Sequence, residues 1–122
     1  MKHFKPHEFD SPDLKGSGEL MDSTFLSMLE EARAEANIPF KINSGYRTIK
    51  HNKHLAKKGY KVSKDSSHLK GLAADIKCVD SRGRFIILNA LINAGFTRIG
   101  IAKTFIHVDC DIDKPSQVIW VY

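Results

Sequence analysis

The apolar residues of this sequence follow a helical period in two segments. Between residues 25 and 32 they recur three or four positions apart, and they do so again between residues 85 and 92. Asp22 or Ser23 is suited to cap the first of these helices. Gly95 follows the second, and glycine is favoured just beyond a helix end. The pattern therefore predicts two amphipathic helices of about three turns each.

Short strands are expected elsewhere in the chain. Residues 40–44 alternate apolar with polar side chains and lead into a glycine, and residues 73–79 form a second candidate. Three further runs lie too close together for helical crossovers, so we expect them to pair antiparallel: residues 97–101, 105–109 and 117–121. Together with a basic helix over residues 48–58, the pattern predicts an α+β fold with helices packed on a small antiparallel sheet.

The size and composition fit one globular domain. The chain has 122 residues, of which 42% are hydrophobic and 27% are charged. This length allows a core, and the balance is ordinary for a globular protein. We therefore expect residues 1–122 to form a single domain. The only linker-like stretch, residues 11–18, is rich in Ser, Gly and Pro and is expected to be an N-terminal loop.

The formal net charge of +5 attracts anionic partners. Nucleic acid and the anionic bacterial wall both qualify. The lysine-rich stretch from Lys50 to Lys64 has Tyr60 as its only aromatic residue and contains no groove-reading motif, so we expect no nucleic-acid binding. A solvated basic surface that keeps the protein soluble is the alternative to any steering role.

The sequence predicts neither a signal peptide nor a membrane span. Its first residues, MKHFKPHEFD, lack the apolar centre of a signal peptide, and no stretch approaches the ~20 apolar residues that cross a membrane. We expect a soluble monomer that is made in the cytoplasm and does not bind membranes. Cys78 and Cys110 are too few for a disulfide framework, and we expect both to be structural thiols rather than metal ligands.

A candidate metal centre combines residues from distant parts of the chain. His68 and Asp75 are seven positions apart, and His107 follows Asp75 by thirty-two positions. Two imidazoles and a carboxylate suit Zn²⁺, and three protein ligands leave a fourth position for water, as in catalytic zinc sites. We expect His68 on a loop that folds back beside the strand carrying Asp75. The spacing alone does not distinguish a metal site from two histidines and an aspartate that lie on the surface by chance.

Strand parity adds Asp109 to this group. Side chains alternate along residues 105–109, so Asp109 faces the same way as His107. His51 and His54 offer a second histidine pair, three positions apart on a predicted helix. Lysines surround that pair and would repel a cation, so we expect a solvated face there.

Three sequence blocks together resemble a known family. They are Ser44-Gly45-Tyr46-Arg47, the pattern S-x-H-x-x-G-x-A-x-D over residues 66–75, and His107-Val108-Asp109. With Phe4 to Phe9, they cover nearly the whole chain. The family is that of the zinc D-Ala-D-Ala carboxypeptidases and peptidoglycan endopeptidases, which share a core with the hedgehog signalling domain. The chain resembles the branch that ends in H-V-D. Because no signal peptide is predicted, a wall substrate would require release by another route, as for a phage endolysin.

The resemblance implies roles for individual residues. It implies that His68, Asp75 and His107 bind zinc, and that Arg47 lies at the rim of the site and binds substrate or the developing oxyanion. A neighbouring guanidinium is suited to stabilise such a charge. A structural salt bridge at the strand end is the alternative role for Arg47.

The sequence departs from several family members at one position. Where they place Glu or Asp as general base, three residues before the last zinc-binding histidine, this chain has Thr104. A threonine hydroxyl is no base near neutral pH. Asp109 is the available substitute, and its alternative role is to orient His107 as a hydrogen-bond acceptor.

The polar residues next to His68 are expected to have supporting roles. Ser66 and Ser67 adjoin His68 but lack a nucleophile-elbow pattern, so we expect Ser66 to hydrogen-bond near the site and to help set the loop. Lys70 is expected to face solvent, where it is free to touch an anionic substrate.

These observations predict a zinc metallopeptidase. We expect it to hydrolyse an amide bond in the peptide part of bacterial peptidoglycan by metal-activated water, as a carboxypeptidase or an endopeptidase. The alternative is a non-catalytic zinc-binding domain of the same fold, used for cell-wall binding or assembly; Thr104 favours that alternative.

Overall fold

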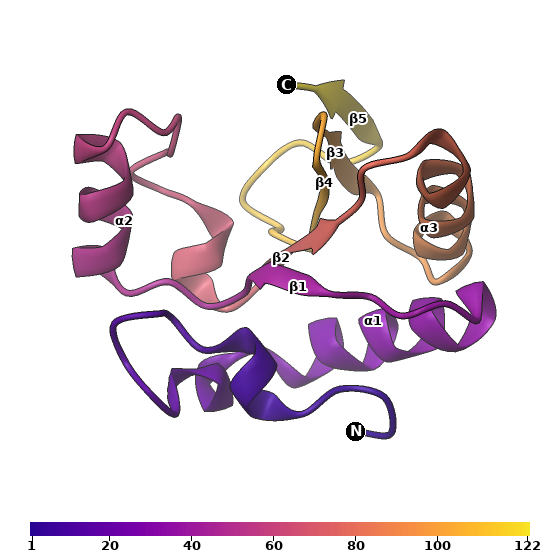
Figure 1. The fold of residues 1–122 in the computed structure, drawn as a ribbon, viewed down its shortest axis with the longest axis horizontal. Helices are drawn as coiled ribbons and strands as arrows, with labels where there is room; N and C mark the ends of the chain where they lie inside the picture. Colours follow the sequence, from indigo (N-terminus) through magenta and orange to yellow (C-terminus); the bar gives the residue numbers. More distant parts are fainter.

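A computed structural model describes residues 1–122. The chain combines three α-helices with a five-stranded sheet (Figure 1), which confirms the predicted α+β class. The helices are α1 (Ser23–Ala36), α2 (Ile49–Lys57) and α3 (Ser81–Asn93), and the short 3₁₀ helices are η1 (Pro6–Phe9), η2 (Ser17–Leu20) and η3 (Ser67–Lys70). The strands are β1 (Ile42–Ser44), β2 (Ala73–Lys77), β3 (Arg98–Ile101), β4 (Phe105–Asp109) and β5 (Val118–Val121). None of the helices is long and apolar enough to span a membrane.

Each α-helix begins at a side-chain cap. Asp22, Thr48 and Asp80 each accept a hydrogen bond from the backbone amide three residues further on. This contact satisfies one of the amides that a helix start leaves without an internal partner. Gly95 follows α3 with φ of 101°, a left-handed conformation that glycine adopts without steric cost. The helix boundaries therefore lie close to those predicted from the sequence.

The strands occur in the order β1-β2-β4-β3-β5. The first three pairings are antiparallel, as predicted, but β5 pairs parallel with β3. The expectation of antiparallel pairing was wrong for residues 117–121. The reason is that β4 already has β2 and β3 as neighbours, so β5 adds to the sheet beside β3 instead of beside β4. The chain leaves β4 at Asp109, opposite Arg98 at the start of β3, and β5 therefore runs in the direction of β3.

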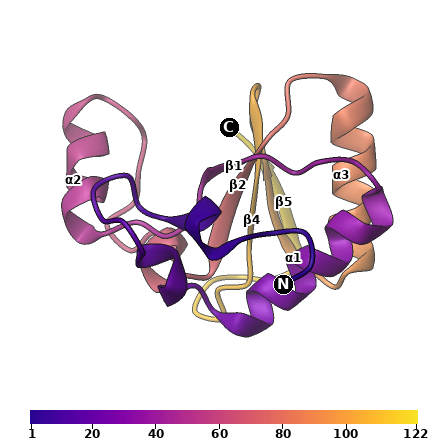
Figure 2. The ribbon, with the colours of Figure 1, turned by 60° about the horizontal axis from the view of Figure 1, so that its bottom comes forward.

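The two faces of the sheet have different coverings. Figure 2 shows α1 and α3 together on one side of the sheet and α2 on the other. The core lies on the α1 and α3 side and contains, among others, Phe25, Leu29, Ile87, Leu91, Ile76, Ile106 and Val108. On α3 the buried stripe is Ile87, Ala90 and Leu91, whereas Phe85, which the sequence pattern counted as apolar support, is 74% exposed. The sheet face toward α2 is left free to carry polar side chains.

One row of residues crosses all five strands on that free face. Ser44 lies opposite Asp75, Asp75 opposite His107, His107 opposite Gly100, and Gly100 opposite Trp120. Directly opposed residues in a sheet have neighbouring side chains. The candidate ligands Asp75 and His107 are therefore brought together by strand register alone.

Candidate metal centre

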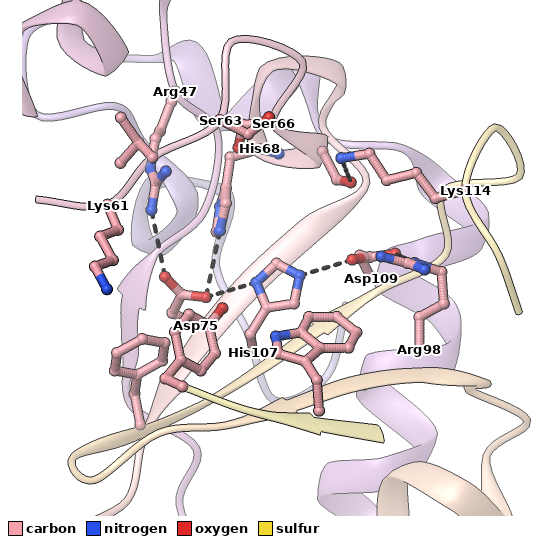
Figure 3. Close-up of a pocket in the computed structure, with 15 residues that line it drawn as sticks. Arg47, Lys61, Ser63, Ser66, His68, Asp75, Arg98, His107, Asp109 and Lys114 are labelled. Carbon is pink, nitrogen blue, oxygen red and sulfur yellow. Dashed lines mark hydrogen bonds and ion pairs between the residues drawn. The ribbon is translucent and has the colours of Figure 1, made fainter. Parts of the chain in front are cut away.

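The three predicted ligands converge on one point of the free sheet face. Asp75 comes from β2, His107 from β4 and His68 from η3, which lies beside the sheet (Figure 3). One ligand atom from each lies within 4.8 Å of the others, and all three residues are buried. The other histidines take no part in this group: His51 and His54 lie on α2, and His3 pairs with Glu30.

His68 is placed by a short helix instead of the expected loop. Ser66 caps η3, and its hydroxyl accepts a hydrogen bond from the His68 amide at 3.3 Å. Gly71 ends η3 with φ of 70°, and a Cβ there would lie 2.5 Å from the carbonyl oxygen of Leu20. Glycine is therefore required at this position both for conformation and for space.

The hydrogen bonds of His68 define which ring nitrogen is free. Its Nδ1 lies 2.7 Å from the carbonyl oxygen of Gly45, which only accepts, so Nδ1 carries the proton. Burial lowers the pKa of His68 and favours the neutral ring. The Nε2 lone pair then faces Asp75 Oδ1 at 3.3 Å. Two acceptors at this distance have no proton to share, and a cation is the group that satisfies both.

His107 is held in the complementary way. Its Nε2 donates to Asp109 Oδ2 at 2.7 Å, while its Nδ1 lies 2.9 Å from Asp75 Oδ1. Burial opposes protonation of this ring, but the hydrogen bonds to Asp109 and Asp75 outweigh it and raise the pKa of His107. For Asp75, burial would raise the pKa, yet the two imidazoles lower it well below its usual range. Oδ1 of Asp75 is thus the anionic centre that both rings face.

The residues present fit a zinc ion. His68 Nε2, Asp75 Oδ1 and His107 Nδ1 form the nitrogen and oxygen donor set that zinc prefers. The second nitrogen of each ring already has a fixed hydrogen-bond acceptor, as metal-binding histidines commonly do. The donor set also borders a cavity, so one side of it is open.

Asp109 faces His107, as strand parity predicted, and it is 1% exposed. Its Oδ2 accepts from His107, and its Oδ1 accepts from Arg98 Nε at 2.7 Å and from the Asp111 amide at 3.1 Å. Burial would raise the pKa of Asp109, but His107, the Asp111 amide and Arg98 lower it. The carboxylate is therefore ionised, fixed and well supplied with donors.

Arg47 lies deeper than the rim position that the family resemblance implied. It is 9% exposed, and its Nη2 lies 3.4 Å from Asp75 Oδ2. Its Nε donates to Ser44 Oγ at 3.0 Å, and its Nη1 lies 3.4 Å from Asn52 Oδ1. The guanidinium thus forms the ion pair at the strand end, and it also lines the cavity.

A cavity of about 230 Å³ lies over the centre. Besides the residues described above, its wall includes aromatic side chains and lysines, among them Phe105, Trp120, Tyr122, Lys61 and Lys114. Strand parity placed Phe105 on the face of His107, whereas the other four were not predicted to line the site. Trp120 and Tyr122 had a detectable signal, because they alternate with Ile119 and Val121 along β5 and therefore share one face. Lys61 and Lys114 carried none, since both lie outside the regular elements.

Trp120 reaches this position because Gly100 has no side chain. A Cβ on Gly100 would lie 2.5 Å from Trp120 Nε1, so any other residue would displace the indole. The ring centroid of Trp120 lies 5.5 Å from that of His107, and the Arg98 guanidinium stands 5.1 Å above the indole. The indole therefore covers one flank of His107 and limits the access of water to it.

A second polar cluster ties η3 to the segment after β4. Asp111 is 2% exposed and accepts hydrogen bonds from Ser67 Oγ at 2.8 Å and from Lys70 Nζ at 3.0 Å. Lys70 also contacts Asp113, at 3.1 Å. Lys70 is exposed, as expected, but its charge is already paired with two carboxylates. The cluster joins the segment carrying His68 to the strand carrying His107.

The cysteines lie outside the donor set. Cys78 is buried in the core, and Cys110 is partly buried. Burial, reinforced by nearby carboxylates, raises the pKa of the Cys110 thiol to about 11. A thiol with so high a pKa is a poor nucleophile and a poor ligand near neutral pH.

Comparison with known proteins agrees with this description. The sequence model of the peptidase M15 family matches residues 2–110, so the chain belongs to the peptidase M15 family. No curated protein matches the sequence. Among solved structures, the Serratia marcescens L-Ala D-Glu endopeptidase ChiX has a similar fold, with a TM-score of 0.65 and 16% sequence identity. The similarity covers 78% of this chain and 84% of that one. β5 lies beyond the residues that the family model matches.

The first prediction concerns the donor set. The protein should bind one equivalent of Zn²⁺, and Asp75→Ala should lose it, because the carboxylate stands between both imidazoles. Zinc competes with protons for His107, whose pKa is raised, so affinity should fall as the pH decreases. Elemental analysis after gel filtration measures occupancy. The single tryptophan, Trp120, should report titration through its fluorescence, since its ring lies 5.5 Å from His107.

His51→Ala and His54→Ala are the matched controls and should retain full metal content. Full zinc occupancy in Asp75→Ala, or no stoichiometric metal in the unaltered protein, would contradict the ligand assignment.

The second prediction concerns Asp111. Asp111→Asn should weaken zinc binding by about tenfold, because the neutral side chain no longer holds Ser67 and Lys70 and so releases the segment carrying His68. It should also reduce the free energy of unfolding by about 1–3 kcal/mol, the usual cost of losing a buried charged hydrogen-bond partner. Asp113→Asn is the control, since that carboxyl side chain is 75% exposed. Equal behaviour of the two variants would remove the positioning role of Asp111.

Proposed function

We propose that the protein is a zinc-dependent peptidase that cleaves an amide bond in the peptide part of bacterial peptidoglycan. The observation that carries the proposal is the buried donor set of His68, Asp75 and His107 at the floor of a cavity, in a chain of the peptidase M15 family. The substrate class is supported by the similar fold of an L-Ala D-Glu endopeptidase.

The proposed chemistry follows from an open, three-ligand site. Zinc held there supplies Lewis acidity, which activates water near neutral pH and polarises the scissile carbonyl. The protein supplies the rest: two rings of fixed tautomer, a carboxylate that is ionised at any working pH, and a partly apolar wall that restricts solvent. Each of these contacts exists before substrate arrives, so little reorganisation is needed during the reaction.

The cavity wall suits an anionic peptide. Peptidoglycan stem peptides carry free carboxylates, and Lys61 presents an ammonium group on the wall, whereas the ammonium of Lys114 is already held by Asp65, Ser67 and Asp111. Trp120, Tyr122 and Phe105 form an aromatic cluster that offers an apolar surface for the short side chains of such peptides. We assign to these side chains the binding of the stem on either side of the scissile bond.

Arg47 is suited to electrostatic stabilisation. Only part of its donor capacity is engaged, since two of its contacts are as long as 3.4 Å. Its guanidinium lines the cavity beside Asp75, where it neutralises that carboxylate and can donate to a carbonyl oxygen as negative charge develops there. We therefore assign to Arg47 both the ion pair and the stabilisation of the oxyanion.

For Asp109 we favour orientation of His107 over the role of general base. Its two oxygens already accept from His107, Arg98 and the Asp111 amide, and the side chain is 1% exposed. A general base needs an oxygen within reach of water. Thr104 is no alternative, because it is exposed in the turn before β4 and does not line the cavity.

The third prediction tests the function directly. The zinc-loaded protein should release peptides from purified peptidoglycan, because its open metal centre borders a cavity suited to an anionic peptide. Mass spectrometry of the products should show one new amino and one new carboxyl terminus within the stem, and their masses identify the bond. A chelator should stop the release and added Zn²⁺ should restore it. His68→Ala is the inactive control. Intact peptidoglycan after incubation with zinc-loaded protein would favour the non-catalytic alternative.

The fourth prediction separates the two roles of Asp109. If Asp109 orients His107, Asp109→Asn should weaken zinc affinity by about 10- to 100-fold, and activity should recover when zinc is added. Zinc affinity and turnover are measured on the same preparation. Thr104→Ala should have little effect on either. If Asp109 is instead the base, Asp109→Asn should retain zinc but lose roughly 10²-fold in turnover, and excess zinc should not restore it.

A further inference from the structure

The positive charge of this protein is concentrated in one segment. Residues 36–64 contain eight of the nineteen Lys and Arg residues and none of the fourteen Asp and Glu residues. The remaining chain therefore has eleven basic and fourteen acidic residues, and its formal charge is −3. The net charge of +5 thus reflects a local charge of +8 on an otherwise slightly acidic protein.

Most of these cations lie on α2 and on the segment that follows it. Lys50, Lys53, Lys57 and Lys58 are exposed on or next to α2, and Lys61 and Lys64 are exposed after it. Figure 1 shows α2 standing away from the sheet, on the opposite side of the molecule from α3. Asn52 is the only buried residue of α2. The helix therefore contributes little to the core and displays most of its surface outward.

The lysines of this surface repel one another. Lys50, Lys53 and Lys57 follow at helical spacing, so they share one stripe of α2. None of them forms an ion pair, whereas Lys70, Lys114, Arg47 and Arg98 all do. Like charges at this spacing destabilise a helix. An external polyanion would relieve this repulsion, because no carboxylate of the protein forms an ion pair with these three lysines.

The cationic surface is continuous with the proposed catalytic cavity. Asn52 donates to the Ser63 carbonyl at 2.9 Å and is contacted by Arg47. Lys61 and Ser63 line the catalytic cavity, and Val62 lines both that cavity and a second one of about 510 Å³ beside α2. Lys53, Lys57 and Lys64 border the second cavity. A chain bound along α2 therefore lies next to the entrance of the candidate metal centre.

We propose that α2 and residues 58–64 form a docking surface for a phosphate-rich anionic polymer of the bacterial cell wall. The choice of a wall polymer rests on the proposed function. Lys50 and Lys57 are seven residues apart, about 10 Å along the helix. Charges spread over this length fit repeated phosphodiesters better than one small anion. Docking would hold the cavity beside peptidoglycan to which the polymer is attached.

The other polyanions fit this surface less well. Tyr60 is the only aromatic side chain from Thr48 to Lys64, so the segment itself offers no row of aromatic rings on which successive unpaired bases could stack. Ile49 is the one large apolar side chain that α2 exposes, and a single such side chain is too little to insert the helix into a lipid surface.

Co-sedimentation with purified cell walls tests the proposal. Walls that retain their phosphate polymer are compared with walls from which mild acid has extracted it, at several salt concentrations. The protein should bind the intact walls, and this binding should weaken steeply with salt as counterions compete. Binding to the extracted walls should be at least about tenfold weaker. Equal binding to both kinds of wall would overturn the proposal.

Two triple variants with the same charge change locate the surface. Lys50→Gln with Lys53→Gln and Lys57→Gln should weaken binding at least about tenfold, because three phosphate contacts are lost. Lys77→Gln with Arg82→Gln and Lys103→Gln, all exposed residues outside the segment, should remain within about twofold of the unaltered protein. Circular dichroism and zinc content verify the fold of both. Equal losses in the two variants would show that only net charge matters and would overturn the proposal.

Competition experiments decide between polymer classes. Duplex DNA, phosphatidylglycerol vesicles and extracted wall polymer are each added to wall-bound protein, and the phosphate concentration at which each displaces the protein is measured. The proposal is overturned if DNA or the vesicles displace the protein at a lower phosphate concentration than the wall polymer does. The assay reads binding, and His68→Ala is included so that wall digestion does not reduce the pellet. The binding assay and the cleavage assay are therefore independent. A failure to bind walls would not contradict the proposed peptidase activity, and wall binding can be measured even if the protein cleaves no peptide.

Discussion

The candidate metal centre depends on the register between β2 and β4. This register places Asp75 directly opposite His107, and it extends across the sheet to Gly100 and Trp120. Side chains on a strand alternate between faces, so a slip of one residue would send His107 into the core and bring a neighbouring apolar side chain to the site. The register is fixed by the opposite face, where Ile76, Ile106 and Val108 are completely buried. The packing of the core thus holds two of the three ligands in place.

Hydrogen bonds from residues outside the donor set orient the two histidine rings. Each histidine ring has one nitrogen bound to a fixed acceptor, the Gly45 carbonyl for His68 and Asp109 for His107. The remaining nitrogens are left to face Asp75. Asp109 is itself held by Arg98, and Asp111 connects the strand end to η3. Breaking a contact in this layer would change the orientation of a ring without removing a candidate ligand, so we expect these residues to influence metal affinity.

The charged side chains of the cavity and those of α2 differ in their electrostatic environment. In the cavity, charges are buried, paired and close together, which makes them strong and insensitive to salt. On α2 they are exposed, unpaired and of one sign, which makes them suited to weak, salt-sensitive attraction of a polyanion. Most residues that line the cavity lie within residues 2–110, which match the family model. Trp120 and Tyr122, from β5 and the residue after it, lie beyond that match.

The sequence by itself determined the helices, most strands and which residues are candidates for the central site. Caps, periodicity and strand parity are local properties, and they placed α1, α2 and α3 and turned Asp109 toward His107. Tertiary structure decided what depends on contacts between distant segments. It set β5 parallel to β3, because both edges of β4 were already occupied, and it paired Lys70 with Asp111, forty-one residues away. It also brought Trp120 over Gly100 and set Arg47 against Asp75. Such contacts depend on which strand edge and which side of the sheet remain available after the core has packed, and a local pattern does not carry that information.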